Sequence, residues 1–392
     1  MNSDDRYYLR RYLTRRQVIR GGSFGAAAAA VAAAGGGRYL RALAQEATPG
    51  ATPTAFDPAA CYQSFPDAKP VKYDRAGDPP YNIAFSNGYI GNVWRTQMIN
   101  MSKAFVEHDD IKPLIKDYQV GSSGEDVAAQ IAQTENMISA GAQAVILNAI
   151  SPTGLNPTIQ RAREEGIVIV SFDNTVTAPD VVNVNEDQVE MGKKWAEFLV
   201  EQTGGKGKIL MVNGVAGTSV DQDRQKGAKD VFAQNSGIST VEVVGKWDPG
   251  IAQTVTSQAL SANSDIAGVW CQGGTDGAVR AFLEAKRPLV PFAGEAENGF
   301  RKQMLQYKDQ FQAISIGQSP GLVCVSIHAV LDLLQGNEVP SSISVPLPIT
   351  TTADLQPGVN VFPDAPDNFF VSINIPPCGV NMTYDEINAA GS

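Results

Sequence analysis

The chain has 392 residues, 43% of them hydrophobic and 18% charged. These proportions are typical of a soluble globular protein and exclude the disordered and fibrous classes. Single cores seldom grow to this length, so two domains are expected. The chain has 31 basic and 41 acidic residues, of which eight basic and two acidic ones precede residue 45. The rest of the chain therefore has 23 basic and 39 acidic residues and a net charge of −16. So acidic a surface repels phosphate backbones, and we expect no nucleic-acid partner.

Residues 1–44 have the pattern of an export signal. Arg15 and Arg16 precede a run of small apolar residues, 25–34, and Ala42 to Ala44 form an A-x-A cleavage motif. The apolar run is too short to anchor the chain in a bilayer. We therefore expect a twin-arginine signal peptide over residues 1–44, and a protein exported to the periplasm or the cell-envelope exterior.

From residue 45 onward the chain changes from a linker to alternating elements. Residues 45–80 are rich in Ala, Thr, Pro and Asp without apolar periodicity, which predicts a linker. The expected strands are residues 82–85, 114–120, 144–148, 168–172, 208–212, 241–247, 268–271, 290–293 and 311–317. The expected helices are residues 93–107, 125–139, 156–165, 189–202, 219–234, 251–262, 276–285 and 320–334. This alternation predicts an α/β fold with doubly wound parallel sheets.

Polar loops follow the expected strands in both halves of the chain. In doubly wound sheets ligands bind at the carboxyl ends of the strands, so polar groups spread over two halves favour a cleft between two lobes. A sugar needs flat apolar faces and planar groups that bond hydroxyls in pairs. The side chains of these kinds near the loops are Trp94, Trp247, Asn148, Asp173, Arg224, Asp248 and Gln318.

Patterns for catalysis or metal binding are sparse. The two histidines, His108 and His328, have no histidine or cysteine partner at metal-ligand spacing. No phosphate-binding loop of the G-x-x-x-x-G-K-[ST] type and no C-x-x-C pair occurs. We therefore expect neither an enzyme nor a bound metal or cofactor.

The four cysteines divide into two pairs by their surroundings. Cys271 and Cys324 fall in apolar stretches and are expected to be buried thiols. Cys61 and Cys378 lie near the two ends of the exported chain, where a disulfide between them would tie both tails to the body. Sequence alone does not fix the connectivity.

The run Gly214 to Ser219, followed by Arg224, resembles the periplasmic ribose-binding protein group. Segments 146–148, 171–173 and 314–320 match further motifs of that group in the same order, and the resemblance covers roughly residues 81–348. It implies a type 1 periplasmic binding protein: two lobes joined by a three-strand hinge. The implied parts are an N-terminal lobe of residues 81–185 plus 319–345, a C-terminal lobe of 186–318 plus 346–380, and a tail of 381–392.

The resemblance also implies a ligand site. It assigns the hinge position to Gln318, and it leaves Glu295 and Glu297 competing for one second-lobe acid. Gly273 and Gly274 stand where the family usually has Asn-Asp, which leaves the ligand's identity open. The expected ligand-binding residues are Asn92, Trp94, Asn148, Asp173, Asn174, Arg224, Trp247, Asp248, Glu295 and Gln318.

The function expected from these features is capture of a solute outside the cytoplasm. A monomer would close around a monosaccharide or polyol and deliver it to the membrane permease of an ABC importer. One alternative is a receptor of the same fold for a non-nutrient signal, such as a quorum-sensing molecule. Another is an exported glycoside-processing enzyme that uses Asp173 and Glu295 as paired acids. Residues 350–392, with a strand at 369–375, are expected to pack on the second lobe.

Overall fold

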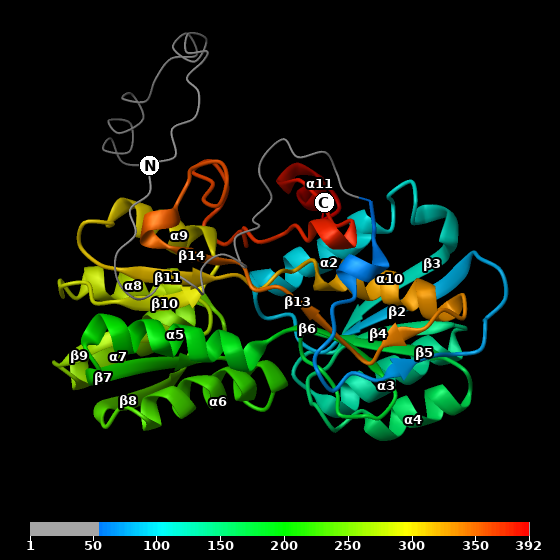
Figure 1. Ribbon diagram of the computed structural model, residues 1–392, viewed down its shortest axis with the longest axis horizontal. Coiled ribbons are helices and arrows are strands. Elements are labelled where there is room, and N and C mark those ends of the chain that lie inside the picture. Colours follow the sequence, from blue (N-terminus) through cyan, green and yellow to red (C-terminus); the bar gives the residue numbers. More distant parts are fainter. Residues whose placement is uncertain (1–54, 392) are drawn as a thin grey trace, which may run out of the picture. The chain divides into compact units, whose positions relative to one another are not determined.

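The computed structural model describes residues 55–391, and the expected signal peptide lies outside them. Two six-stranded sheets form the centres of two lobes (Figure 1). Their orders are β13-β6-β5-β4-β2-β3 and β14-β11-β10-β9-β7-β8. All neighbouring strands run parallel except β11 and β14, which are antiparallel. The predicted α/β fold with two doubly wound lobes is confirmed.

The first lobe contains strands from both ends of the described chain. Its strands are β2 (Tyr81–Asn87), β3 (Ile115–Ser122), β4 (Ala144–Asn148), β5 (Val168–Phe172), β6 (Val182–Glu186) and β13 (Ser342–Val345). Its helices are α2 (Val93–Phe105), α3 (Val127–Ser139), α4 (Asn156–Glu164) and α10 (Leu322–Leu334). Helices α2 and α10 pack on one face of the sheet and α3 and α4 on the other, so both faces are buried.

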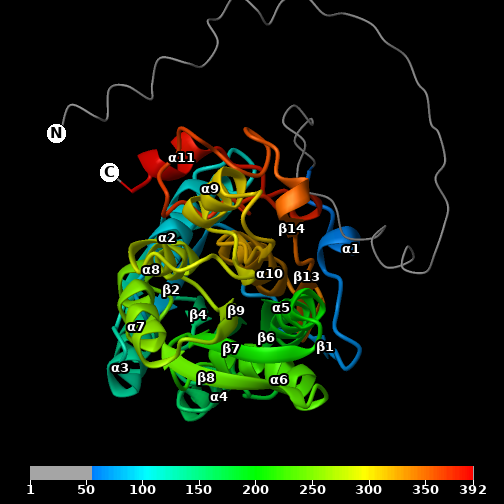
Figure 2. The same ribbon diagram turned by 90° about the vertical axis from the view of Figure 1, so that its left-hand side faces the viewer.

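The second lobe repeats this arrangement. Its strands are β7 (Lys206–Asn213), β8 (Gly237–Val244), β9 (Ile266–Cys271), β10 (Phe292–Glu295), β11 (Ala313–Ile316) and β14 (Ile349–Thr351). Its helices are α5 (Gln188–Thr203), α6 (Ser219–Ala233), α7 (Pro249–Ala262), α8 (Thr275–Glu284) and α9 (Asn298–Gln306). Figure 2 shows this sheet between α5 and α6 on one face and α7 and α8 on the other.

Short elements lie near the two ends of the described chain. They are α1 (Pro58–Cys61), β1 (Pro70–Val71) paired with β12 (Val339–Pro340), α11 (Tyr384–Ala389), and 3₁₀ turns at Lys112–Leu114, Thr352–Asp354 and Pro376–Cys378. Three segments carry the chain between the two sheets: from β6 to α5, from β11 to α10, and from β13 to β14. The ligand-site candidate Gln318 lies in the second of these.

Several helices begin where the sequence offers a capping side chain. Asp126, Asp187, Thr218 and Asp248 each accept a backbone N–H from the first turn of the helix that follows. Such caps satisfy amide groups that have no partner inside the helix, which fixes where each helix starts. The loops before α6 and α7 are thereby held at the carboxyl edge of the second sheet.

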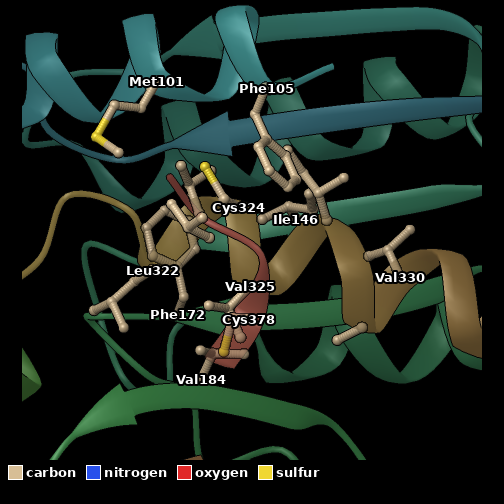
Figure 3. Packing of buried hydrophobic residues seen from close by; sticks show 14 of the residues in the cluster. Met101, Phe105, Ile146, Phe172, Val184, Leu322, Cys324, Val325, Val330 and Cys378 are labelled. Atoms are coloured by element: carbon tan, nitrogen blue, oxygen red, sulfur yellow. The ribbon is translucent and has the colours of Figure 1, made fainter. Parts of the chain in front are cut away.

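The core of the first lobe is built around α10. Of its 13 residues only Asp332 is not buried, because the helix lies between the sheet, α2 and the C-terminal part of the chain. Figure 3 shows Cys324 and Val325 of α10 among Phe105, Ile146 and Phe172, with Cys378 in the same cluster. The buried position expected for Cys324 is confirmed, as it is for Cys271.

The C-terminal extension, residues 352–391, follows the prediction that it packs on the second lobe only in its first part, and the prediction of a strand at 369–375 is wrong. Its first part contacts the second lobe, where Asn360 and Phe362 accept hydrogen bonds from the side chains of Arg301 and Asn298. From Phe369 onward its apolar side chains join the core of the first lobe. The segment expected as a strand forms only isolated bridges, because its backbone bonds to several different elements.

A disulfide joins Cys61 to Cys378, which confirms the pairing considered from the sequence. Closing a loop this long removes many conformations from the unfolded chain.

We expect the double variant Cys61→Ser/Cys378→Ser to lose about 2–5 kcal/mol of unfolding free energy in urea titrations. Thiol titration of the unreduced, unfolded protein should find two free thiols, those of Cys271 and Cys324. Four free thiols would contradict the bridge.

His328 makes the stability of the first lobe depend on pH. Its ring stacks on Phe56 and meets Phe105 edge-on, and burial lowers its pKa to about 4, against the opposing charges of Asp110 and Asp332. In the unfolded chain the histidine titrates near pH 6.5. Between pH 6.5 and 4 the unfolded chain therefore binds a proton at this residue that the folded protein does not bind. This contribution to stability is complete above pH 6.5 and is lost as the pH falls.

We expect the His328→Leu variant to show a weaker pH dependence than the wild type. Between pH 6.5 and 4.5, the wild type should lose about 2 kcal/mol more unfolding free energy than the variant. Urea denaturation at the two pH values measures this difference. Equal losses in the two proteins would show that His328 is not the titrating group.

Candidate functional site

A cavity lies where the carboxyl ends of both sheets face each other. Its walls come from the carboxyl ends of strands and the loops after them, from the N-terminal parts of α2 and α6, and from the C-terminal extension. The residues that line it are Asn92, Trp94, Arg95, Asp173, Val220, Arg224, Trp247, Gln272, Gly273, Glu295, Gln318 and Phe370. Seven of the ten predicted site residues are in this set.

Asp173 is the centre of the first-lobe wall. It follows β5, is 3% exposed, and its carboxylate accepts hydrogen bonds from Asn148 (3.0 Å) and Asn174 (2.9 Å). Arg95, from the first turn of α2, forms an ion pair with the same carboxylate at 3.0 Å. Burial lowers the pKa of Arg95, and Asp173 opposes that effect. Four donors, counting Gln318, therefore hold Asp173 in one position.

Arg224 is the corresponding group of the second lobe. It lies in α6, is 1% exposed, and donates to the side chain of Gln188 (2.7 Å) and to the carbonyl of Gln272 (2.9 Å). It also forms an ion pair with Glu295 at 2.6 Å. Helix α5 passes close enough to α6 that a Cβ on Gly192 would lie 2.0 Å from the Arg224 carbonyl oxygen. Glycine at position 192 thus allows the approach that places this guanidinium.

Gln318 connects the two charged centres. Its amide nitrogen donates to Asp173, its amide oxygen accepts from Arg224, and its backbone carbonyl accepts from the indole of Trp94 at 3.0 Å. Because Asp173 and Arg224 belong to different lobes, one side chain in the crossing segment from β11 to α10 joins both walls of the cavity.

Two buried polar atoms of the lining have no hydrogen-bond partner. They are Nη1 of Arg95, a donor, and Oε2 of Glu295, an acceptor. Burial raises the pKa of Glu295, and the nearby Arg224 lowers it. Unpaired buried donors and acceptors are costly, so these two atoms are suited to pair with groups of a bound molecule.

Glu297, the other acid considered at this place, has a structural role. Its carboxylate accepts the backbone N–H groups of Gly274 and Thr275 at the start of α8, the second at 2.8 Å. Burial and the charge of Asp276 raise its pKa to about 8. Only Glu295 of the two lines the cavity.

Trp247 reaches the cavity through an uncommon backbone conformation. Its φ is 58°, in the left-handed region that bulky residues rarely adopt, and Asp173 also has a φ of 58°. Its indole N–H donates to Gln272 at 3.3 Å, and a Cβ on Gly214 would lie 2.3 Å from the ring. Strain of this kind persists only where surrounding contacts enforce it, and here it occurs at two lining residues.

Three predicted site residues lie outside the lining. Asn148 and Asn174 are buried behind Asp173 and orient its carboxylate. Asp248 caps α7 by accepting the Ile251 N–H at 2.8 Å. Asp248 was expected in the site because it follows a predicted strand, but a residue that caps the next helix occupies the same kind of position.

The structure adds lining residues that sequence reasoning missed. Arg95 directly follows the predicted site residue Trp94 in α2 and pairs with Asp173, so its place in the sequence could have indicated a role in the site. Gln272 and Gly273 lie in a loop already recognised as polar. Val220 and Phe370 carried no signal, and Phe370 comes from the C-terminal extension.

Residues 317–321, between β11 and α10, also fit the G-x-S-x-G pattern of serine hydrolases. The Ser319 hydroxyl accepts the Gly321 N–H at 3.0 Å and is buried. Over residues 55–391 no hydrogen bond links it to a histidine: His108 pairs with Glu386, and His328 stacks on Phe56. The pattern here forms a turn of the crossing segment.

Contacts at the rim hold the lobes together around the cavity. Tyr89 and Ile150 of the first lobe form a buried cluster with Val215 of the second. Lys246 forms an exposed ion pair with Glu125 at 3.2 Å across the same gap. The lobes are therefore in the closed arrangement.

Within residues 55–391, no group of three or more His, Cys, Asp or Glu side chains could hold a metal ion. In the same part of the chain no helix is long and apolar enough to span a membrane.

Similar proteins include sugar- and polyol-binding ones. The chain is 29% identical over 178 residues to a xylitol-binding protein of Mycolicibacterium smegmatis, which covers 44% of this chain and 51% of that protein. It is 24% identical over 230 residues to a ribose import binding protein of Bacillus subtilis, covering 58% and 74%. The chain thus spans about half of the first relative and about three quarters of the second.

Solved structures show the same fold. An ABC transporter solute-binding protein from Thermobispora bispora is 28% identical with a TM-score of 0.63, covering 68% of this chain and 84% of that one. The sequence of residues 83–338, about two thirds of the chain, matches the family of periplasmic binding protein domains. The two-lobed fold, the interlobe cavity and this match lead to one conclusion: the chain belongs to the periplasmic binding protein domain family.

Proposed function

We propose that this protein captures a neutral monosaccharide or polyol in the cavity between its lobes and delivers it to the permease of an ABC importer. The observation that carries the proposal is the balance of groups in the cavity. Two guanidinium groups, Arg95 and Arg224, each pair with a carboxylate, Asp173 and Glu295. Since these charges compensate, the cavity favours a ligand without net charge.

The unpaired atoms narrow the ligand class further. A free donor on Arg95 and a free acceptor on Glu295 suit hydroxyl groups, because a hydroxyl both donates and accepts. The indoles of Trp94 and Trp247 supply apolar area against which C–H groups can pack. The relatives named for xylitol and ribose bind molecules of this chemistry.

Closure of the lobes distinguishes the ligand-bound protein from the free protein. A ligand that bonds Asp173 in one lobe and Arg224 in the other gains contacts in the closed state that the open state lacks, so binding shifts the population toward closure. In the proposed cycle, a monomer is exported through its twin-arginine signal, and the permease recognises the closed form.

Thermal unfolding with a panel of uncharged aldoses and polyols, including D-ribose, xylitol and glycerol, tests this proposal. A ligand present at 100 times its Kd should stabilise the protein by about 2.7 kcal/mol. A phosphorylated sugar should give no shift, because its charge has no counterpart in the cavity. A glycoside and a quorum-sensing compound are tested beside the panel, and turnover of the first or stabilisation only by the second would replace this function with one of the alternatives.

A matched pair of variants tests the location of the site. Asp173→Asn and Asp248→Asn make the same chemical change, the first in the cavity and the second at a helix cap where asparagine serves equally well. We expect Asp173→Asn to weaken binding of the best panel ligand at least tenfold, because the Arg95 partner is lost. Asp248→Asn should leave the Kd within threefold, measured by titration calorimetry. The reverse result would move the site to the loop before α7.

A further inference from the structure

Phe370 brings the C-terminal extension to the ligand cavity. Among residues 55–391, it is the only lining residue outside segment 83–338, which matches the periplasmic binding protein domain. The extension comes from the second lobe and continues into the core of the first. At this position it therefore passes directly beside the closed cleft.

The backbone of Phe370 is fixed by a single side chain of the first lobe. Its N–H donates to the side-chain oxygen of Gln97, and its carbonyl accepts from the side-chain nitrogen of the same residue, each at 2.9 Å. Gln97 is buried in α2, one turn after Trp94. Both hydrogen-bonding groups of one glutamine are thus used to hold the backbone of Phe370.

The neighbours of Phe370 bond to the second lobe instead. The Val371 N–H donates to the carbonyl of Ala296 at 3.0 Å, and the Phe369 carbonyl accepts from the Asn298 N–H at 2.8 Å. Ala296 directly follows Glu295, which lines the cavity. Phe370 is consequently clamped between α2 of one lobe and the loop after β10 of the other.

The following residues of the extension lie against the crossing segment between β11 and α10. A Cβ on Gly317 would lie 2.1 Å from the Ser372 hydroxyl, and one on Gly321 would lie 2.9 Å from the Ile373 carbonyl oxygen. Beyond them the disulfide of Cys378 ties the extension to Cys61. The backbone on both sides of Phe370 is therefore held by hydrogen bonds, and further along the chain the disulfide anchors it.

We propose that Phe370 is a ligand-binding residue, contributed by the C-terminal extension, whose ring packs against the C–H face of the sugar or polyol. This inference rests on the proposed function and adds a wall to its site. A phenyl ring cannot satisfy a hydroxyl, so it favours the apolar face of a ligand whose hydroxyls turn toward Asp173 and Arg224. Because Phe370 lines the cavity, the extension is part of the proposed recognition surface.

Calorimetric titration of three variants tests the role of Phe370, with the panel ligand that stabilises the wild type most as the probe. Phe370→Ala removes the ring, and Phe370→Leu keeps most of the apolar volume and all backbone bonds. Val371→Ala is the matched control, because Val371 is equally buried beside Phe370 but does not line the cavity. Near-ultraviolet circular dichroism and the melting temperature of each unliganded variant establish that it is folded.

We expect Phe370→Ala to raise the Kd at least tenfold and Phe370→Leu to raise it about threefold, with Val371→Ala within twofold of the wild type. If the wild type binds and both Phe370 variants bind as tightly, Phe370 does not contact the ligand and the inference is overturned while the proposed function stands. If Val371→Ala weakens binding as much as Phe370→Ala, the extension acts only through folding, which also overturns it. A wild type that binds no panel member overturns the proposed function itself.

Discussion

The amide of Gln318 is the interaction on which the closed site depends. It lies in a segment that crosses between the lobes, donates to Asp173 of the first and accepts from Arg224 of the second. Each of those charges is buried, and a buried charge is tolerable only with partners that match it. The neutral amide is a hydrogen-bond partner of both Asp173 and Arg224. It therefore connects the two cavity walls without adding a charge.

The buried groups around this amide explain why the site is rigid within each lobe. Asn148 and Asn174 orient Asp173 from behind, and Gln188 and the Gln272 carbonyl orient Arg224. Glu186, at the end of β6, accepts the Ser319 N–H, and burial raises its pKa well above the usual value. Lobe movement can then be confined to the crossing segments, while the groups that meet the ligand keep their geometry.

The C-terminal extension modifies this arrangement. Besides the three segments that cross between the sheets, it is a fourth connection between the lobes. Apolar packing and the disulfide attach it to the first lobe. Its bonds to Gln97 on one side and to Ala296 and Asn298 on the other must all adjust when the lobes separate. The extension thus couples the hinge region to the cavity wall.

Sequence patterns determined the alternation of strands and helices, because fully buried parallel strands appear as short apolar runs. For β4 and β5 the predicted and observed bounds agree. Short strands such as β6, β13 and β14, and the helix α9, lack such runs or caps and were missed. The residues around Asp173, Arg224 and Gln318 could be named because motifs of a known family mark them.

The tertiary structure alone decided which of the polar loop residues share a cavity. Asp248 and Asp173 both follow strands, yet one caps a helix and the other faces Arg224. Arg95 and Phe370 are separated by 275 positions in the sequence, and only the packing of α2 against the extension brings both to one wall. Local patterns determine elements, whereas a site depends on contacts between residues distant in sequence, which no local pattern records.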